Sequence, residues 1–144
     1  NTLEAYANLV NPVSQPICPI LDAKKKEVYT ARFKYKNNKL VKETPDQAVS
    51  PQELCEMTQE PSVFLGGGVE PYKDFLASRL GNKFIENAPV KNQTIAASAV
   101  QIVLNQSQAN PGFNLDALTI HYVRKSEAEI NNNILNQEVV KHGY

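Results

Sequence analysis

Three consecutive glycines, Gly66, Gly67 and Gly68, form the stretch of this sequence best suited to bind a phosphate. A short apolar run precedes them and a helix is predicted to begin at Pro71, so backbone amides and a helix N-terminus could receive a phosphate or a nucleoside. The loop lacks the lysine of a P-loop and the spacing of a dinucleotide-binding loop, and Glu70 puts negative charge where an anion would approach. The alternative is a tight turn that needs positive φ angles, and we favour it.

Other reactive side chains are few and widely spaced. Cys18 and Cys55 lack the paired spacing of zinc or redox sites, and we predict that both are free thiols. His121 and His142 lie far apart with no second ligand nearby, which argues against a metal site. The two carboxylates of residues 126–129 (SEAE) carry no mark of an acid and base pair. We therefore predict no catalytic residue, no metal and no cofactor for this chain.

Eight of the fifteen basic residues lie between residues 24 and 42. The only acidic residue opposing them there is Glu27, so this stretch could contact RNA phosphates. The alternative is a solvated strand face with lysines protecting a sheet edge, and we favour it because the nearby aromatic residues are assigned to the core. The eight are Lys24, Lys25, Lys26, Arg32, Lys34, Lys36, Lys39 and Lys42.

The hydrophobic pattern predicts three antiparallel strands around these residues. Residues 17–21 (ICPIL) form an apolar run typical of a strand covered on both faces. Over residues 27–36 inward and outward side chains alternate, and only Val28 breaks the pattern. The asparagine pair at 37–38 predicts a tight hairpin turn, from which residues 39–44 return as the third strand. The predicted inward side chains are Tyr29, Ala31, Phe33 and Tyr35, and the outward ones are Thr30, Arg32, Lys34 and Lys36.

Helix caps and helical periodicity predict the remaining elements. Ser50, Pro51 and Glu53 combine an N-cap, a helix-starting proline and a capping box, which predicts a helix to about residue 58. Residues 94–106 form the most apolar helix, which we expect to pack flat on the sheet between two layers. The other predicted elements are a helix over 2–10, strands over 62–65 and 83–85, and a helix from residue 71 that ends at Gly81.

This order of elements predicts an α/β fold with a mixed sheet. Antiparallel strands followed by alternating strand and helix are typical of a ribonuclease H-like half-domain of the actin-like, Hsp70 and sugar-kinase superfamily. We expect one lobe over residues 1–124 and a polar tail over 125–144 that could dock a short helix. Because the pattern begins inside a helix at Asn1, the chain looks like a piece of a longer protein.

The overall composition of the chain argues against strong attraction to nucleic acid or lipid. Fifteen basic residues balance fifteen acidic ones, so the net charge is zero. No apolar run approaches the roughly 20 residues that span a bilayer, and we expect no membrane association. Two predicted free thiols fit a reducing, cytoplasmic setting.

Three segments of the sequence resemble the bacterial TsaB family, formerly called YeaZ and grouped with glycoprotease-like proteins. Residues 2–7 (TLEAYA) are similar to a helix of that family, residues 21–29 (LDAKKKEVY) to its hairpin and residues 122–129 (YVRKSEAE) to its ending. The resemblance covers nearly the whole chain, but only the carboxy-terminal half of the family. The motif residues are Asp22, Ala23, Glu27, Val28, Tyr29, Tyr122, Arg124 and Glu127.

The resemblance implies one lobe of a two-lobed, actin-like protein that is a non-catalytic partner of TsaD. With TsaD and the ATPase TsaE, such proteins support transfer of a threonylcarbamoyl group to adenosine 37 of tRNA. Both partners would be contacted through the full-length parent and tRNA only indirectly, and a homodimer is compatible with this role. Gly66 to Gly68 fall at the family's glycine loop, whereas the sequence after Val69 departs from the adenosine loop of TsaD.

A second function class stays open on the sequence alone. The chain could be the carboxy-terminal lobe of an enzyme, either a glycoprotease-like peptidase or an actin-like, nucleotide-binding phosphotransferase. The glycine loop would then be part of a nucleotide site shared between two lobes. Phosphate-loop and metal motifs in the missing amino-terminal lobe would distinguish this enzyme from a scaffold.

Overall fold

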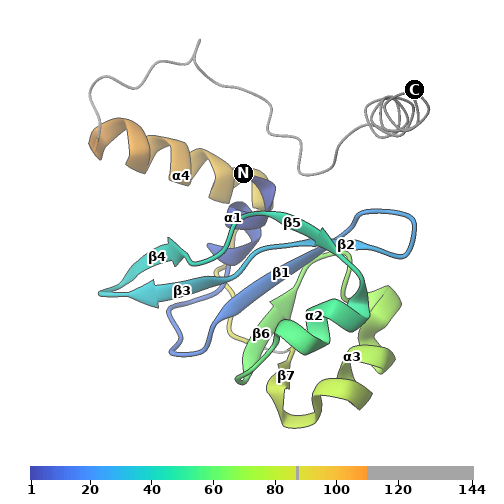
Figure 1. Ribbon diagram of the computed structural model, residues 1–144. Helices are drawn as coiled ribbons and strands as arrows, with labels where there is room; N and C mark the ends of the chain where they lie inside the picture. The colour runs from blue at the N-terminus through green and yellow to red at the C-terminus, as the bar shows by residue number, and fades with distance from the viewer. Residues whose placement is uncertain (87, 110–144) are drawn as a thin grey trace, which may run out of the picture.

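The computed structural model describes residues 1–86 and 88–109 of the chain. In this part of the chain seven strands form one sheet, with helices on both faces (Figure 1). The strands are β1 (Ile17–Asp22), β2 (Val28–Thr30), β3 (Phe33–Lys36), β4 (Lys39–Lys42), β5 (Gln47–Val49), β6 (Ser62–Leu65) and β7 (Phe84–Ile85). The helices are α1 (Thr2–Ala7), α2 (Pro51–Met57), α3 (Lys73–Leu80) and α4 (Ile95–Ala109), with 3-10 turns η1 (Glu70–Tyr72) and η2 (Gly81–Lys83).

The central strand of the sheet is β1. On one side β6 runs parallel to it, and β7 extends the sheet in the same direction. On the other side β2 and β3 pair with β1 antiparallel and in one register, since Thr30 lies opposite Ile20 and Phe33 opposite Ile17. The outer edge consists of β4, paired with β3, and β5, paired with β2. The first strands are therefore antiparallel and the later ones parallel, which confirms the predicted mixed sheet.

The hairpin between β3 and β4 has the predicted turn. Asn37 and Asn38 adopt φ angles of 50° and 61°, in the left-handed region that asparagine tolerates better than most residues. Such a two-residue loop matches the right-handed twist of the flanking strands. The asparagine pair thereby sets the β3 to β4 register, in which Lys36 faces Lys39.

Apolar residues fill both faces of the sheet. On the face covered by α1, Phe33 and Ile17 are 1% and 0% exposed, as predicted for inward positions. On the opposite face, which α2 and α3 cover, Val28 and Thr30 are also buried, at 1% and 3% exposure. The prediction that the Thr30 side of this strand is solvated is therefore wrong over β2. Alternation alone could not reveal this, because a later helix covers that face.

Two helix boundaries follow directly from local chemistry. At the start of α2, the Ser50 amide donates to Glu53 Oε2 at 2.7 Å and the Glu53 amide donates to Ser50 Oγ at 3.2 Å, which is the predicted capping box. At the end of α3, Gly81 has a φ of 54°, as expected for a glycine that stops a helix. The capping box and the stop at Gly81 are confirmed, whereas the helix predicted from residue 71 opens as the 3-10 turn η1 and becomes α-helical at Lys73.

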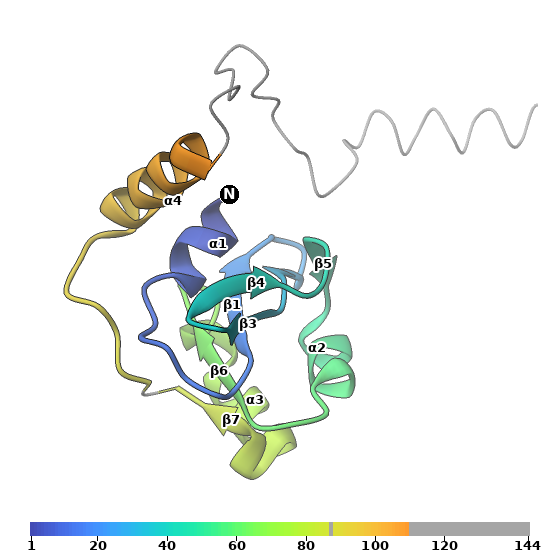
Figure 2. The same cartoon turned by 90° about the vertical axis from the view of Figure 1, so that its left-hand side faces the viewer.

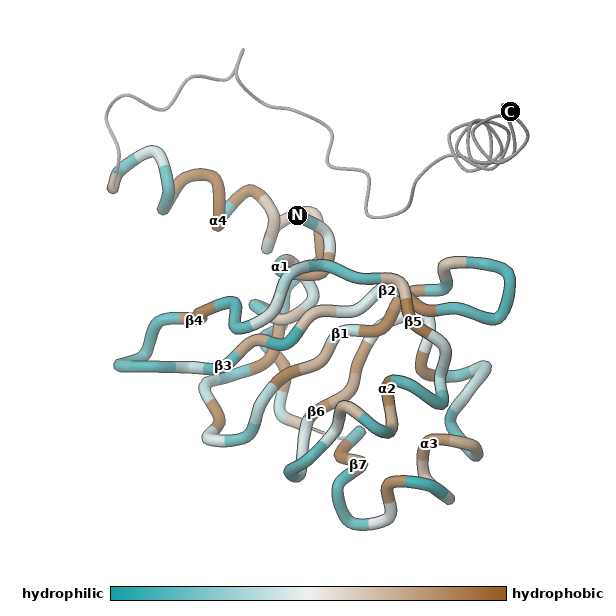
Figure 3. The backbone as a smooth tube through the Cα atoms, in the orientation of Figure 1, coloured by the Kyte–Doolittle hydropathy of each residue, from teal (hydrophilic) through white to brown (hydrophobic). Residues whose placement is uncertain are grey.

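The predicted packing of α4 is wrong, although the helix itself is present. It lies against α1 instead of the sheet, because α1 already covers that face (Figure 2). The contact is polar at its centre: Asn8 Nδ2 donates to Ser98 Oγ at 3.1 Å, and Ser98 Oγ donates to the Ala5 carbonyl at 2.8 Å. Val100 and Leu104 are 58% and 50% exposed, and the hydropathy colouring shows this apolar stretch (Figure 3).

Candidate functional site

The glycine loop and the hairpin motif meet at one edge of the sheet. Gly66 follows β6, and Asp22 is the last residue of β1. Because β1 and β6 are parallel, both segments leave the sheet at the same edge, where open α/β sheets commonly place ligand sites. The Gly68 amide donates to the Ile20 carbonyl at 2.9 Å, so the loop lies directly against β1.

Two of the three glycines are required by the geometry of this loop. Gly66 has a φ of 106°, and a Cβ atom there would lie 2.5 Å from the Ile20 carbonyl oxygen. A Cβ atom on Gly68 would lie 2.8 Å from Ile20 Cγ2, whereas Gly67 has nothing within 4 Å. The Gly68 and Val69 amides donate to the carbonyls of Ile20 and Gly66, so neither points to an external anion. The geometry favours the tight-turn interpretation over a phosphate site.

We expect ATP and adenosine to bind this chain no tighter than about 1 mM. The contribution left for the loop is that of a helix dipole at an exposed site, about 0.3 to 1 kcal/mol, whereas a micromolar complex needs about 8 kcal/mol. Calorimetric titration measures this directly. A micromolar dissociation constant that Gly67→Val abolishes would contradict the expectation, and this variant is informative because the open space at Gly67 lets the loop keep its fold.

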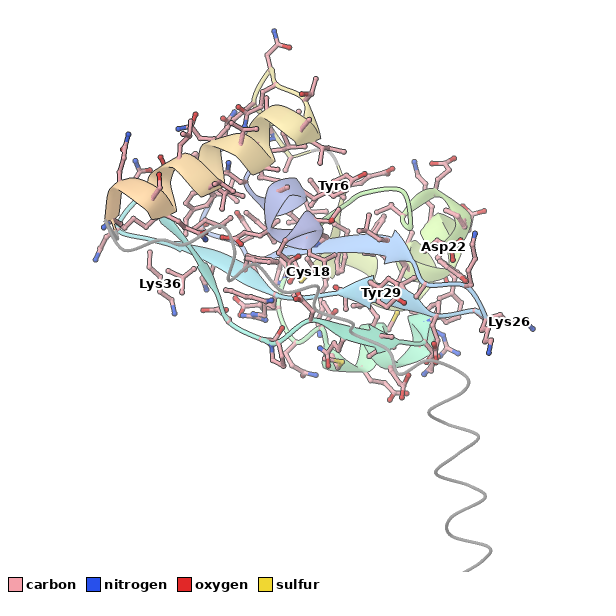
Figure 4. All side chains as sticks on the ribbon, turned by 90° about the horizontal axis from the view of Figure 1, so that it is seen from above. Tyr6, Cys18, Asp22, Lys26, Tyr29 and Lys36 are labelled. Atoms are coloured by element: carbon pink, nitrogen blue, oxygen red, sulfur yellow. The ribbon has the colours of Figure 1, made fainter. Side chains whose placement is uncertain are left out.

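The hairpin motif begins with an aspartate that organises a left-handed turn. Lys24, Lys25 and Lys26 have φ angles of 61°, 51° and 62°. Asp22 stabilises this turn because its Oδ1 accepts from the Lys24 amide at 2.8 Å and its Oδ2 from Lys24 Nζ at 2.7 Å. These hydrogen bonds from Lys24 lower the pKa of the Asp22 carboxyl. Asp22 and Lys26 lie at the same end of the sheet (Figure 4).

The rest of the hairpin motif is explained by packing and backbone pairing. The Ala23 amide donates to the Glu27 carbonyl at 3.0 Å, and Ala23 is 5% exposed. Val28 is buried in the core cluster shared with α2 and α3, and Tyr29 is half-buried opposite Leu21. The remaining motif residues, Tyr122, Arg124 and Glu127, lie outside the described residues, as does the boundary predicted at residue 124.

Neither cysteine is activated as a nucleophile. Burial raises the pKa of the Cys18 thiol to about 12, and burial also raises the pKa of Cys55. Both are free thiols, as predicted. Within residues 1–86 and 88–109 no group of three His, Cys, Asp or Glu residues could hold a metal ion. His121 and His142 lie outside this part of the chain.

More carboxylates lie near the basic residues 24–42 than the local sequence suggested. The prediction that Glu27 is the only acidic residue opposing them is therefore wrong. Arg32 Nε lies 2.9 Å from Glu43 Oε2, and the Arg32 guanidinium also pairs with Glu60. These carboxylates come from later segments that the fold brings back to the sheet. Further ion pairs of the stretch include Lys24 with Asp22, Lys34 with Glu60, Lys36 with Glu43 and Lys42 with Asp46. Such neutralised lysines fit a solvated strand face better than an RNA site.

A similar fold occurs in a solved structure with little sequence likeness. That structure is described as an uncharacterized protein with similarity to peptidase YeaZ from Pseudomonas aeruginosa, and it has a TM-score of 0.54 and 12% identity to this chain. The match covers 77% of this chain and 50% of the other. Together with the strand order, the match shows that the chain has the mixed α/β fold of that YeaZ-like structure.

A sequence comparison shows which protein family the chain resembles. The chain is 33% identical over 117 residues to the tRNA threonylcarbamoyladenosine biosynthesis protein TsaB of Bacillus subtilis (strain 168). The chain is thus a TsaB-like sequence, which confirms the predicted resemblance. The match covers 78% of this chain and 49% of the relative, so the chain spans about half of the relative's length. No protein-family model matches the chain.

None of the helices within the described residues has the length and hydrophobicity needed to cross a membrane.

Proposed function

We propose that this chain acts, as part of a TsaB-length protein, in the biosynthesis of threonylcarbamoyladenosine in tRNA. The observation that carries the proposal is its 33% identity over 117 residues to a TsaB protein named for that pathway. Its role would be that of a non-catalytic, cytoplasmic partner that stabilises a TsaD-like transferase. A TsaE-like ATPase would join the same assembly, and tRNA would be contacted through the partners.

Two features of the described residues support a scaffold over an enzyme. The glycine loop uses the amides of Gly68 and Val69 to hold itself against β1, which leaves few donors for a nucleotide. The thiols of Cys18 and Cys55 have raised pKa values and are poor nucleophiles at neutral pH. The loop amides and the two thiols thus contribute to the fold, and neither is arranged to act on a substrate.

Complementation tests the assigned pathway. The full-length gene that encodes this chain is expressed in a bacterium depleted of its own TsaB, and threonylcarbamoyladenosine in bulk tRNA is measured by mass spectrometry of nucleosides. We expect the modification to return towards its original level. If the protein accumulates to the level of the native TsaB and the modification stays absent, the proposed function is wrong.

A reconstituted reaction separates the partner role from an enzymatic one. We expect the purified full-length protein alone to show no transfer or peptide hydrolysis, and transfer to require a TsaD-like protein. Asp22→Ala is informative here, because it should loosen the hairpin turn without removing a reacting group. Turnover by the protein alone that disappears on a point substitution within this chain would instead support the peptidase or phosphotransferase alternative.

A further inference from the structure

An open cavity of about 730 Å³, lined by both polar and apolar side chains, lies between α4, α1 and the β3 to β4 hairpin. In Figures 1 and 2, α4 extends beyond α1 on the side of this hairpin. The cavity volume is within the usual range for a small-molecule site, about 300 to 1,000 Å³. It is distant from the glycine loop, so it is not explained by the hairpin motif or by the proposed function.

The cavity stays open because α4, the helix that covers it, is longer than α1, the helix on which α4 packs. With 15 residues, α4 is about 22 Å long, whereas α1 has only six residues. Ser98, near the start of α4, is hydrogen-bonded to Ala5 of α1 and to Asn8, which caps the end of α1. The later part of α4 lines the cavity with Gln101 and Asn105, whose amides gain little from apolar collapse.

One cation in this cavity has only neutral partners. Backbone pairing fixes Lys91, since its amide donates to the Leu9 carbonyl at 2.6 Å. Its Nζ donates to Asn8 Oδ1 at 3.1 Å and lies 3.5 Å from the Tyr35 hydroxyl oxygen. Tyr35 in turn donates its hydroxyl proton to the Val10 carbonyl at 2.9 Å, which leaves its oxygen to face the ammonium group.

The environment of Lys91 differs from that of the lysines on the sheet. Lys24, Lys36 and Lys42 each pair with a carboxylate, whereas Lys91 pairs with no acidic residue of the described chain. Lys91 is half-buried, and burial lowers the pKa of its ammonium group. A partly desolvated cation without a counterion gains more than an exposed one from an incoming anion.

Two further charged groups line the cavity and limit the charge of a ligand. Lys39, on the hairpin, adds a second positive charge, and Glu4, on α1, adds one negative charge. No ion pair joins either residue to another group of the described chain. Counting Lys91 and Lys39 against Glu4, the lining carries one net positive charge at neutral pH. A singly charged anion therefore matches it better than a polyphosphate.

We propose that this cavity binds a small polar molecule carrying one negatively charged oxyanion, either a carboxylate or a phosphodiester. The anion would pair with Lys91. Gln101 Nε2 donates to Asn105 Oδ1 at 3.2 Å, so the Gln101 carbonyl oxygen and the Asn105 amide nitrogen would hydrogen-bond the neutral part of the ligand. This proposal does not rest on the pathway role, because it uses none of the motif residues.

Calorimetry and amide NMR with two sets of probes test the proposal on the full chain. One set consists of aromatic carboxylates, each with its neutral carboxamide, and the other of 3′,5′-cyclic nucleotides, each with its nucleoside. We expect at least one anion to bind with a dissociation constant below about 1 mM and to shift the amide signals of Lys91 and Gln101. Its neutral counterpart should bind at least about tenfold more weakly, as expected for loss of a charge-assisted hydrogen bond.

Two substitutions with opposite expected effects on binding test whether the ligand is held by the positive charge of Lys91. We expect Lys91→Met to weaken binding at least about tenfold and Glu4→Gln to tighten it. Lys26→Gln, at the far end of the sheet (Figure 4), serves as the matched control and should leave binding unchanged. Thermal unfolding of each variant checks the fold, and if Lys91→Met does not fold, the lysine side-chain NMR signal of the unaltered protein provides the readout. Binding should then raise the pKa of the Lys91 ammonium group.

The set of probes that binds assigns the anion: carboxylates alone, cyclic nucleotides alone, or both. The proposal is overturned if neither set binds below about 1 mM, or if each neutral counterpart binds as tightly as its anion. Equal binding by a folded Lys91→Met protein, or an unchanged pKa of Lys91 on binding, would overturn it as well. Failure here leaves the complementation result unaffected, so the two proposals are tested separately.

Discussion

Phe33→Ala is expected to lower the free energy of unfolding by about 3 to 5 kcal/mol, the range for emptying a buried aromatic site. Phe33 is 1% exposed and packs in the core cluster beneath α1 with Ile17 and Val63. It also pairs with Ile17 of the central strand, so the neighbouring backbone cannot collapse freely into the space left behind. Urea denaturation followed by circular dichroism measures the change.

The matched control is the next residue on the same strand. Lys34 points to the opposite face, and its ammonium group lies 3.7 Å from the Glu60 carboxylate with 30% of the side chain exposed. Such a partly exposed pair contributes little, so Lys34→Ala should change the stability by less than about 0.5 kcal/mol. Equal effects from the two substitutions would show that the assignment of the strand's faces is wrong.

Gly66→Ala is expected to lower the free energy of unfolding by about 2 to 5 kcal/mol, as the sum of two contributions. A side chain at a φ of 106° is strained, and unfavourable positive φ costs about 1 to 2 kcal/mol. The new Cβ would lie 2.5 Å from the Ile20 carbonyl oxygen, which forces the loop away from β1. Displacement of a packed backbone adds about 1 to 3 kcal/mol.

Gly67→Ala provides the comparison within the same loop. A Cβ atom at Gly67 meets nothing within 4 Å, and its φ does not lie in the positive region. Its stability should therefore change by less than about 1 kcal/mol in either direction. Equal destabilisation at Gly66 and Gly67 would mean that the loop does not lie against Ile20.

Much of the fold was predictable because its signals are local. The Asn37 and Asn38 turn, the Ser50 capping box and the Gly81 helix stop each depend on residues within a few positions of one another. The antiparallel register of β1, β3 and β4 follows from short connections. The TsaB-like motif at residues 21–29 is local too, and it corresponds to a turn held by its own aspartate.

The errors arose where burial depends on segments distant in sequence. An apolar helix such as α4 predicts that something covers it, but periodicity does not say whether that is the sheet or another helix. In the structure α1 already occupies the sheet face, and α4 meets it through the buried Ser98. Likewise, the charge balance of the basic stretch could not be read locally, because Glu60 reaches Arg32 only after the chain folds back.

The sequence by itself determined most of the elements, though not β5, together with the three-strand unit, the family resemblance and the glycines of the loop. Only the tertiary structure decided that the loop amides are used against Ile20 and that Lys91 faces a cavity with neutral partners. The physical reason is that capping and turn formation act within one or two turns of backbone. Burial and the pairing of charges, by contrast, depend on which distant segments meet, and Lys91 lies 83 positions from the Asn8 side chain that accepts its hydrogen bond.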